Sequence, residues 1–172
     1  MARLVPRRAP RLPREAARIL RTGDRPLAAA EMTDGGWAVV TPHALVLVIE
    51  DGGAWQVRDR RGWHEVDHAD WAPEPPSIHV RWIEGDESAL GLVSDERAFP
   101  TALRERVESS IVLMQERDLP GGAKVRVAIR RAEDDSLLSQ VSVVGRLRGT
   151  ASEQAAIDAL ERDARAAAGL EP

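Results

Sequence analysis

Residues 64–68 read His-Glu-Val-Asp-His, an arrangement of residue types that can carry metal chemistry. On an α-helix, His64 and His68 would lie one above the other and could bind the same zinc ion. Glu65 would then act as the general base on a zinc-bound water molecule. A small zinc-dependent hydrolase, with zinc as its cofactor, is therefore one hypothesis for the function.

The residues around this motif favour a strand over a helix. Gly62 precedes the motif and Pro73 follows it, which leaves room for only a short helix. Four residues of an extended strand span about 13 Å at about 3.3 Å per residue, which is too far for one ion to bridge. The extended zinc motif also needs a histidine where this chain has Glu74. We therefore favour a chance match within a strand, with no catalytic residue, no metal and no cofactor.

The composition excludes several other chemistries. The 172 residues include no Cys, so a disulfide framework, a cysteine zinc site and a thiol nucleophile are excluded. Phosphate-binding and nucleophile-elbow motifs are absent from the sequence. The isolated His43 and His79 are predicted to be surface or turn residues. Tyr is also absent, so five Trp and one Phe must supply the bulk of the core.

The charge is unevenly distributed along the chain. Residues 1–22 carry +6, whereas the remaining 150 residues carry −10. Such a basic arm could bind an anionic lipid surface or the phosphates of a nucleic acid. We favour the two alternatives that it folds onto the acidic body of the protein itself or stays disordered. No aromatic residue lies between the arginines, which argues against stacking with nucleic-acid bases. The candidate anion-binding or partner-binding residues of the arm are Arg7, Arg8, Arg11, Arg14, Arg18 and Arg21.

Targeting and membrane-spanning segments are not visible in the sequence. Pro6, Pro10 and Pro13 interrupt the apolar core that a signal peptide would need. The longest apolar run, residues 37–49, is too short to span a bilayer and contains Pro42. We therefore expect a cytoplasmic protein.

Residues 24–95 alternate short apolar runs with turn signals. Residues 34–36 and 51–53 each read Asp-Gly-Gly, which is typical of a hairpin turn. Residues 77–83 alternate apolar and polar side chains with the period of a strand. Seven antiparallel strands are predicted, at residues 26–32, 37–41, 44–49, 54–58, 63–71, 77–83 and 89–94.

The remaining segments contain helical patterns and one more hairpin. Apolar residues from Phe99 to Met114 recur on one face of an amphipathic helix predicted over residues 99–117. A hairpin of residues 124–132 and 137–144 precedes a last helix that begins near Thr150. A short helix after Pro13 has an apolar stripe of Leu12, Ala16, Ile19 and Leu20. We divide the chain into a basic arm with a short helix (1–22), a barrel with its capping helix (23–117), and a C-terminal β-hairpin and helix (118–172).

A resemblance to a known family is carried by four segments: residues 23–30, 36–45, 63–71 and 103–112. These segments resemble bacterial PH-like domains, which include GRAM and pleckstrin-homology-like domains, in an uncharacterised actinobacterial group. The resemblance implies an α+β fold: a seven-stranded antiparallel split barrel capped by the amphipathic helix, with the C-terminal hairpin and helix added.

PH-like domains bind lipid headgroups, peptides or protein partners, and no catalytic residues are shared by the group. The first hairpin loop, where members that bind phosphoinositides place Lys and Arg, contains no basic residue here. The expected function is therefore a non-enzymatic binding or scaffold module for an unknown protein partner. Two alternatives stay open: the zinc hydrolase, and a peripheral binder of anionic lipid or nucleic acid through the arm.

Overall fold

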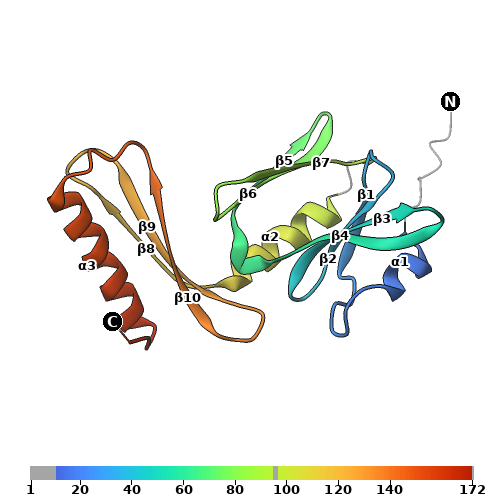
Figure 1. Ribbon diagram of the computed structural model, residues 1–172. Coiled ribbons are helices and arrows are strands. Elements are labelled where there is room, and N and C mark those ends of the chain that lie inside the picture. The colour runs from blue at the N-terminus through green and yellow to red at the C-terminus, as the bar shows by residue number, and fades with distance from the viewer. Residues whose placement is uncertain (1–10, 95–96, 172) are drawn as a thin grey trace, which may run out of the picture.

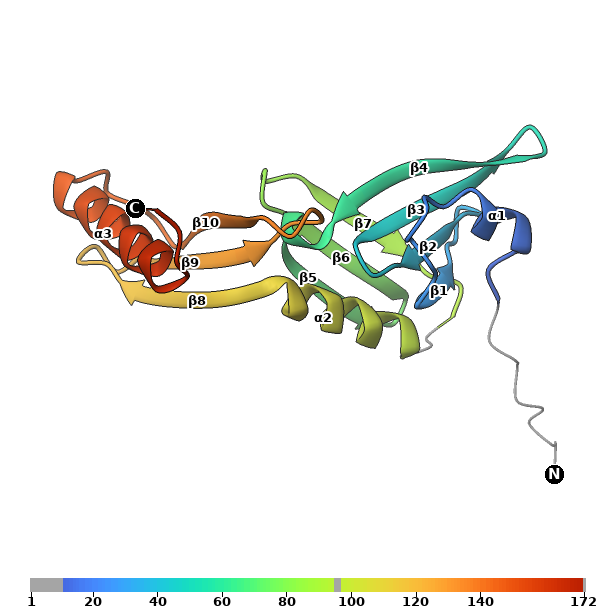
Figure 2. The same ribbon diagram turned by 90° about the horizontal axis from the view of Figure 1, so that it is seen from below.

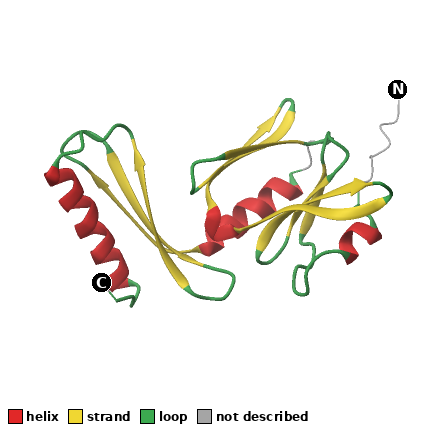
Figure 3. Ribbon diagram, in the orientation of Figure 1, coloured by secondary structure: helices red, strands yellow, loops and turns green. Residues whose placement is uncertain are grey.

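The computed structural model describes residues 11–94 and 97–171. This part of the chain is an α+β structure with ten strands in three antiparallel sheets and three α-helices (Figures 1 and 3). We call residues 11–110 the body and residues 111–171 the C-terminal lobe. In Figure 1 the two lie side by side, and the end of helix α2 connects them.

The described part of the body contains two α-helices, seven strands and a short 3₁₀ turn. They are α1 (Arg14–Arg18), β1 (Ala28–Glu31), β2 (Trp37–Val40), β3 (Ala44–Asp51), β4 (Ala54–Gly62), the 3₁₀ turn η1 (Trp63–Glu65), β5 (Val66–Pro73), β6 (Pro76–Trp82), β7 (Glu87–Gly91) and α2 (Ala98–Ser110). The C-terminal lobe contains β8 (Ile111–Asp118), β9 (Lys124–Arg131), β10 (Leu137–Val144) and α3 (Ala151–Ala167).

The seven predicted strands of the body are all present. They form a four-stranded sheet in the order β1-β2-β3-β4 and a three-stranded sheet in the order β5-β6-β7. The predicted Asp-Gly-Gly turns connect β1 to β2 and β3 to β4. In the first turn, Gly35 has a φ of 87° and Gly36 N donates to Asp34 Oδ1. Only glycine adopts such a φ at little cost, which explains the turn residues.

The two sheets meet at one corner and do not form a closed barrel in the described chain. Met32, just after β1, pairs with Leu92, just after β7. Thr33 N donates to Gly91 O at 2.9 Å beside this pair. At the opposite corner, η1 leads the chain from β4 into β5, and these two strands belong to different sheets. The expected seven-stranded barrel is therefore two antiparallel sheets joined along one corner.

Helix α2 covers the core between the two sheets. Its residues Phe99 and Leu103 are 2% and 4% exposed, and they pack in one cluster with Trp63 and Trp82. Pro100 lies in the first turn of the helix, where a missing N–H costs nothing. The prediction that Trp packs in the core is confirmed for Trp63 and Trp82, and for Trp37 on the opposite side of the first sheet.

The helix predicted over residues 99–117 ends at Ser110, which corrects its C-terminal boundary. Residues Ile111–Asp118 form strand β8, which pairs with β9 (Figure 2). Ile111 and Met114 match the helical period of Phe99 and Leu103 by coincidence, because Ile111 and Val112 are β-branched and favour a strand. The predicted C-terminal hairpin is consequently a three-stranded sheet in the order β10-β9-β8.

The C-terminal lobe has its own core on one face of its sheet. Val125, Val127 and Ile129 of β9 are fully buried against Ile157 and Leu160 of α3. The predicted capping of α3 is confirmed, since Glu153 N donates to Thr150 Oγ1 and Thr150 N donates to Glu153 Oε2. The opposite face of the sheet carries no helix and faces the body (Figure 1).

The described part of the arm lies against the body. Helix α1 follows Pro13 as predicted, and its apolar stripe packs on the outer face of the first sheet. Ala16 is fully buried there beside Trp37 and Val46. None of the helices in the described residues is long and apolar enough to cross a membrane.

The capping role of α2 predicts a specific loss of stability. Leu103→Ala leaves a cavity between the two sheets, and we expect it to lower the free energy of unfolding by about 3 kcal/mol. Leu27→Ala removes the same atoms from a residue that is 42% exposed and should cost less than about 1 kcal/mol. Urea unfolding followed by Trp fluorescence reports on the body, which contains all five Trp. Equal losses for the two variants would contradict a buried capping helix.

Candidate functional site: the groove between the body and the C-terminal lobe

The two histidines of the zinc motif lie in different local structures. His64 is in the 3₁₀ turn η1, whereas His68 is in strand β5. The prediction that this segment is extended is confirmed from Val66 onward, and the turn before it differs from the predicted strand. The helix that would bring both imidazoles to one zinc ion is therefore not present in this segment.

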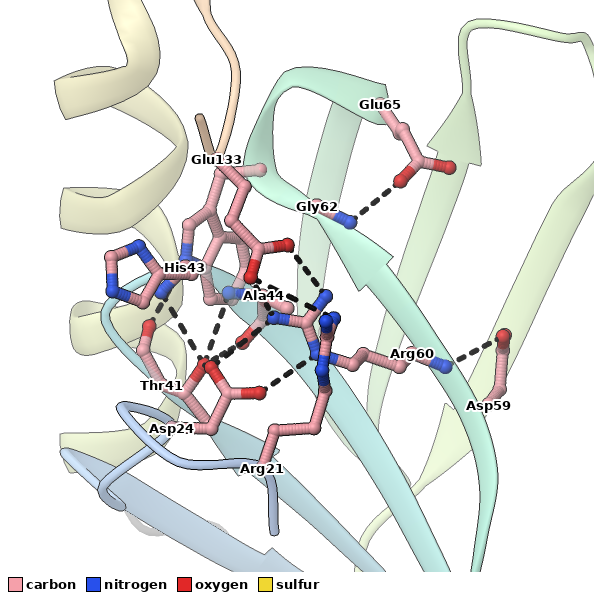
Figure 4. Close-up of polar contacts among 11 residues, drawn as sticks. Arg21, Asp24, Thr41, His43, Ala44, Asp59, Arg60, Gly62, Glu65 and Glu133 are labelled. Atoms are coloured by element: carbon pink, nitrogen blue, oxygen red, sulfur yellow. Dashed lines mark hydrogen bonds and ion pairs between the residues drawn. The ribbon is translucent and has the colours of Figure 1, made fainter. Parts of the chain in front are cut away.

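The side chains of the motif make local contacts instead. Glu65 Oε1 accepts a hydrogen bond from Gly62 N at 2.7 Å, which stabilises the start of η1 (Figure 4). His68 Nε2 lies 3.0 Å from Asp70 Oδ1 on the exposed edge of β5. Within residues 11–94 and 97–171, no group of three or more His, Asp or Glu side chains is arranged to hold a metal ion.

The described arginines of the arm remain on the surface. Arg11, Arg14 and Arg18 are exposed, whereas Arg21 Nη1 lies 3.7 Å from Glu133 Oε1. Arg7 and Arg8 lie outside the described residues. The arm's role as an anion-binding or partner-binding segment stays a prediction.

Arg60 of β4 is the centre of a polar cluster that the sequence analysis did not identify (Figure 4). Its Nε donates to Asp24 Oδ2 at 2.7 Å, and its Nη1 and Nη2 each donate to a carboxylate oxygen of Glu133 at 2.8 Å. Asp24 also accepts from the Thr41 hydroxyl at 3.0 Å and is 3% exposed. Glu133 lies in the β9–β10 turn, so this cluster joins the C-terminal lobe to the body.

The carboxylates of this cluster are held in their charged form. Burial by itself raises the pKa of Asp24, but the hydrogen bonds from Arg60 and Thr41 outweigh it and leave the pKa below its ordinary value. The hydrogen bond from Arg60 is also the main reason why the pKa of Glu133 is lowered. The pKa of Arg60 is raised in turn, chiefly by its hydrogen bond to Asp24.

Two further hydrogen bonds join the lobe to the turn η1. Arg130 Nη1 donates to Trp63 O at 3.3 Å and to Ser110 Oγ at 3.0 Å. Gln140 Nε2 donates to His64 O at 2.6 Å. Both side chains come from the face of the lobe's sheet that α3 leaves uncovered. This face therefore contacts the body at η1.

A groove of about 890 Å³ lies between these walls. One side is formed by strand β5 and helix α2 of the body, and the other by the open face of β8, β9 and β10. Residues 67–71 of β5 all line it. Successive side chains of a strand point to opposite faces, so a surface that touches every residue must run along the edge of the strand.

The edge of β5 gives the groove its chemical character. Strand β5 is the outermost strand of its sheet, and within the described residues the backbone N–H and C=O groups of its outer edge are unpaired. Apolar side chains from three elements line the same groove, including Trp71 of β5, Val107 of α2 and Met114 of β8. This arrangement can bind an extended chain through its backbone and its side chains. Residue patterns did not indicate the groove, because α2 was expected to continue through the residues of β8.

The chain matches no protein-family model, no curated protein and no solved structure with which it was compared. The candidate site is therefore argued from its own geometry.

The Arg60 cluster predicts a loss of stability at acidic pH. The folded-state pKa of Glu133 is lowered, so its contribution to stability is present above the ordinary carboxyl pKa and is lost as the pH falls through the folded value. Between about pH 5 and pH 3, the unfolding free energy of the Glu133→Gln variant should fall less steeply than that of the wild type. Glu84→Gln makes the same change on an exposed turn and should keep the wild-type slope. Parallel profiles for the wild type and Glu133→Gln would contradict the Arg60 contact.

The separation of the two histidines predicts weak zinc binding. We expect isothermal titration of wild-type protein with zinc to give no affinity beyond that of the double variant His64→Ala/His68→Ala. A stoichiometric site that disappears in either single variant would show that both histidines bind one zinc ion and would contradict this prediction.

Proposed function

We propose that this protein is a non-enzymatic binding module that acts in the cytoplasm and has a PH-like body. Support for the PH-like arrangement comes from the order of elements: a four-stranded sheet, a three-stranded sheet and one helix that caps the core between them. The Met32–Leu92 pair, which joins the two sheets at one corner, fits a split barrel. The four segments that resemble PH-like domains lie within this body or, for residues 111–112, just beyond it.

The ligand we propose is an extended segment of a partner protein. The observation that carries this proposal is that the groove runs along the free edge of β5. An extended segment could add to this edge as a fourth strand of the sheet, and its side chains would contact α2 and the lobe. The volume of about 890 Å³ is large enough to enclose several side chains of such a segment.

The polar groups at the groove fit a peptide better than a lipid headgroup. Several of its charged side chains already have partners on the protein: Asp67 accepts from Arg81 at 3.0 Å, and Arg126 donates to Glu116 at 2.7 Å. Backbone hydrogen bonds along β5 need no additional charge from the ligand. The first hairpin loop of the body also lacks the basic residues that a headgroup would require.

Filling the groove should weaken peptide binding without unfolding the protein. Thr101 is an exposed residue of α2 that lines the groove, so Thr101→Trp should weaken binding at least tenfold. Ser109→Trp places the same side chain on an exposed part of α2 away from the groove lining and should bind like the wild type. The probes are peptides selected on the wild-type protein from a randomised displayed library, with affinities measured by fluorescence anisotropy.

Two outcomes would refute the proposed function. One is a library selection that yields no peptide with measurable affinity. The other is a set of selected peptides that bind Thr101→Trp as tightly as they bind Ser109→Trp, since those peptides would occupy another surface.

A further inference from the structure

Arg130 of β9 is a buried cation in the groove whose donors are only partly used. The residue is 4% exposed and lines the groove. Its Nη1 donates to Trp63 O and to Ser110 Oγ, and neither acceptor carries a charge. Among the described residues, its Nε has no hydrogen-bond partner. A buried guanidinium with no carboxylate in direct contact is costly, which makes this residue a candidate ligand site.

The free donors of Arg130 share one edge of the guanidinium group. Nε–H and one N–H of Nη2 point the same way from the planar group, and the described residues accept no hydrogen bond from either nitrogen. This paired edge matches the two oxygens of a carboxylate. Because Nε is fully buried in the free protein, neighbouring groove side chains must move for a carboxylate to reach both nitrogens. Burial lowers the pKa of Arg130, and the carboxylate of Asp67 opposes that effect without forming an ion pair with it. Asp67 is itself bound by Arg81 Nε at 3.0 Å.

Arg130 lies at the end of the groove where strand β5 begins. Trp63, which accepts its hydrogen bond, is three residues before Val66, the first residue of β5. The contacts of Arg130 and Gln140 with η1 close the groove at this end. An extended chain that follows the edge of β5 toward Val66 must therefore end or turn near Arg130.

We propose that the groove binds the C-terminal tail of a partner protein, and that the Nε and Nη2 edge of Arg130 binds its terminal carboxylate. The proposal rests on the proposed function and adds the identity and direction of the ligand. Antiparallel pairing is the more stable choice for an added strand. Because β5 runs from Val66 to Pro73, a strand that pairs antiparallel to it places its own C-terminus beside Val66 and hence near Arg130.

The test compares three pools of acetylated pentapeptides with randomised positions. The first has a free C-terminal carboxylate, the second a C-terminal amide, and the third a C-terminal amide with one fixed internal glutamate. Binding to ¹⁵N-labelled wild-type protein is followed by NMR at the Arg130 Nε–H signal and at the backbone amides of β5. We expect the free-carboxylate pool to shift both sets of signals with an apparent affinity at least tenfold higher than that of either amidated pool.

The other outcomes separate this inference from the proposed function. Equal shifts of the β5 amides by the free and amidated pools would overturn the carboxylate inference and leave peptide binding in place. Equal binding by the internal-glutamate pool would show that an acidic side chain, and no chain terminus, is bound. Absence of shifts at β5 with every pool would overturn both proposals.

Two variants test the role of the guanidinium edge itself. Arg130→Lys keeps the charge but loses the paired donors, so it should remove most of the preference for the free carboxylate. Arg131→Gln removes the next cation along β9, which lies outside the groove lining and is bound to Asp135, so it should keep the preference. Retention of the wild-type preference in Arg130→Lys would overturn the proposal. The wild-type comparison of pools remains valid if the Arg130 variant loses its fold.

Discussion

The arrangement of the whole molecule depends on how Arg60 is shared between two carboxylates. Asp24, Arg60 and Glu133 are far apart in the sequence, and each comes from a different part of the structure: the segment before β1, strand β4 and the β9–β10 turn. The planar guanidinium has enough donors to bind both carboxylates at the same time. The charge that stabilises the body therefore also binds the C-terminal lobe.

The two halves of this cluster differ in their environment. The Asp24 side chain is 2% exposed and that of Glu133 is 39% exposed. A buried carboxylate that loses its cation becomes an uncompensated charge, whereas water can solvate much of Glu133. The ion pair of Arg60 with Asp24 is thus the stronger of the two, and the ion pair with Glu133 is the more easily broken. The hydrogen bonds of Arg130 and Gln140 add contacts at the same junction in which η1 contributes only neutral carbonyl oxygens, and burial protects the bond from Arg130 from screening by salt.

Local patterns were sufficient to predict the strands of the body and the helices α1 and α3. Asp-Gly-Gly turns and alternating apolar residues depend only on neighbouring positions, and all seven strands appear close to where they were expected. The end of α2 could not be predicted in this way. Ile111 fits both a helical face and a strand, and its pairing with Arg130 on β9 decides between them. Contacts between distant residues, such as Arg60 with Glu133, leave no local signal in a single sequence.

The difference between local patterns and contacts of distant residues also explains why the zinc motif and the candidate site do not coincide. The zinc motif is a local pattern whose meaning depends on a helix, and residues 63–73 form a turn and an edge strand instead. That edge strand still matters, because β5 supplies one wall of the groove. The opposite wall comes from the face of the lobe's sheet that α3 leaves uncovered. Residues around His64 and His68 therefore contribute to the groove through their backbone geometry. The buried cation of the groove comes from Arg130, more than 60 residues later in the chain.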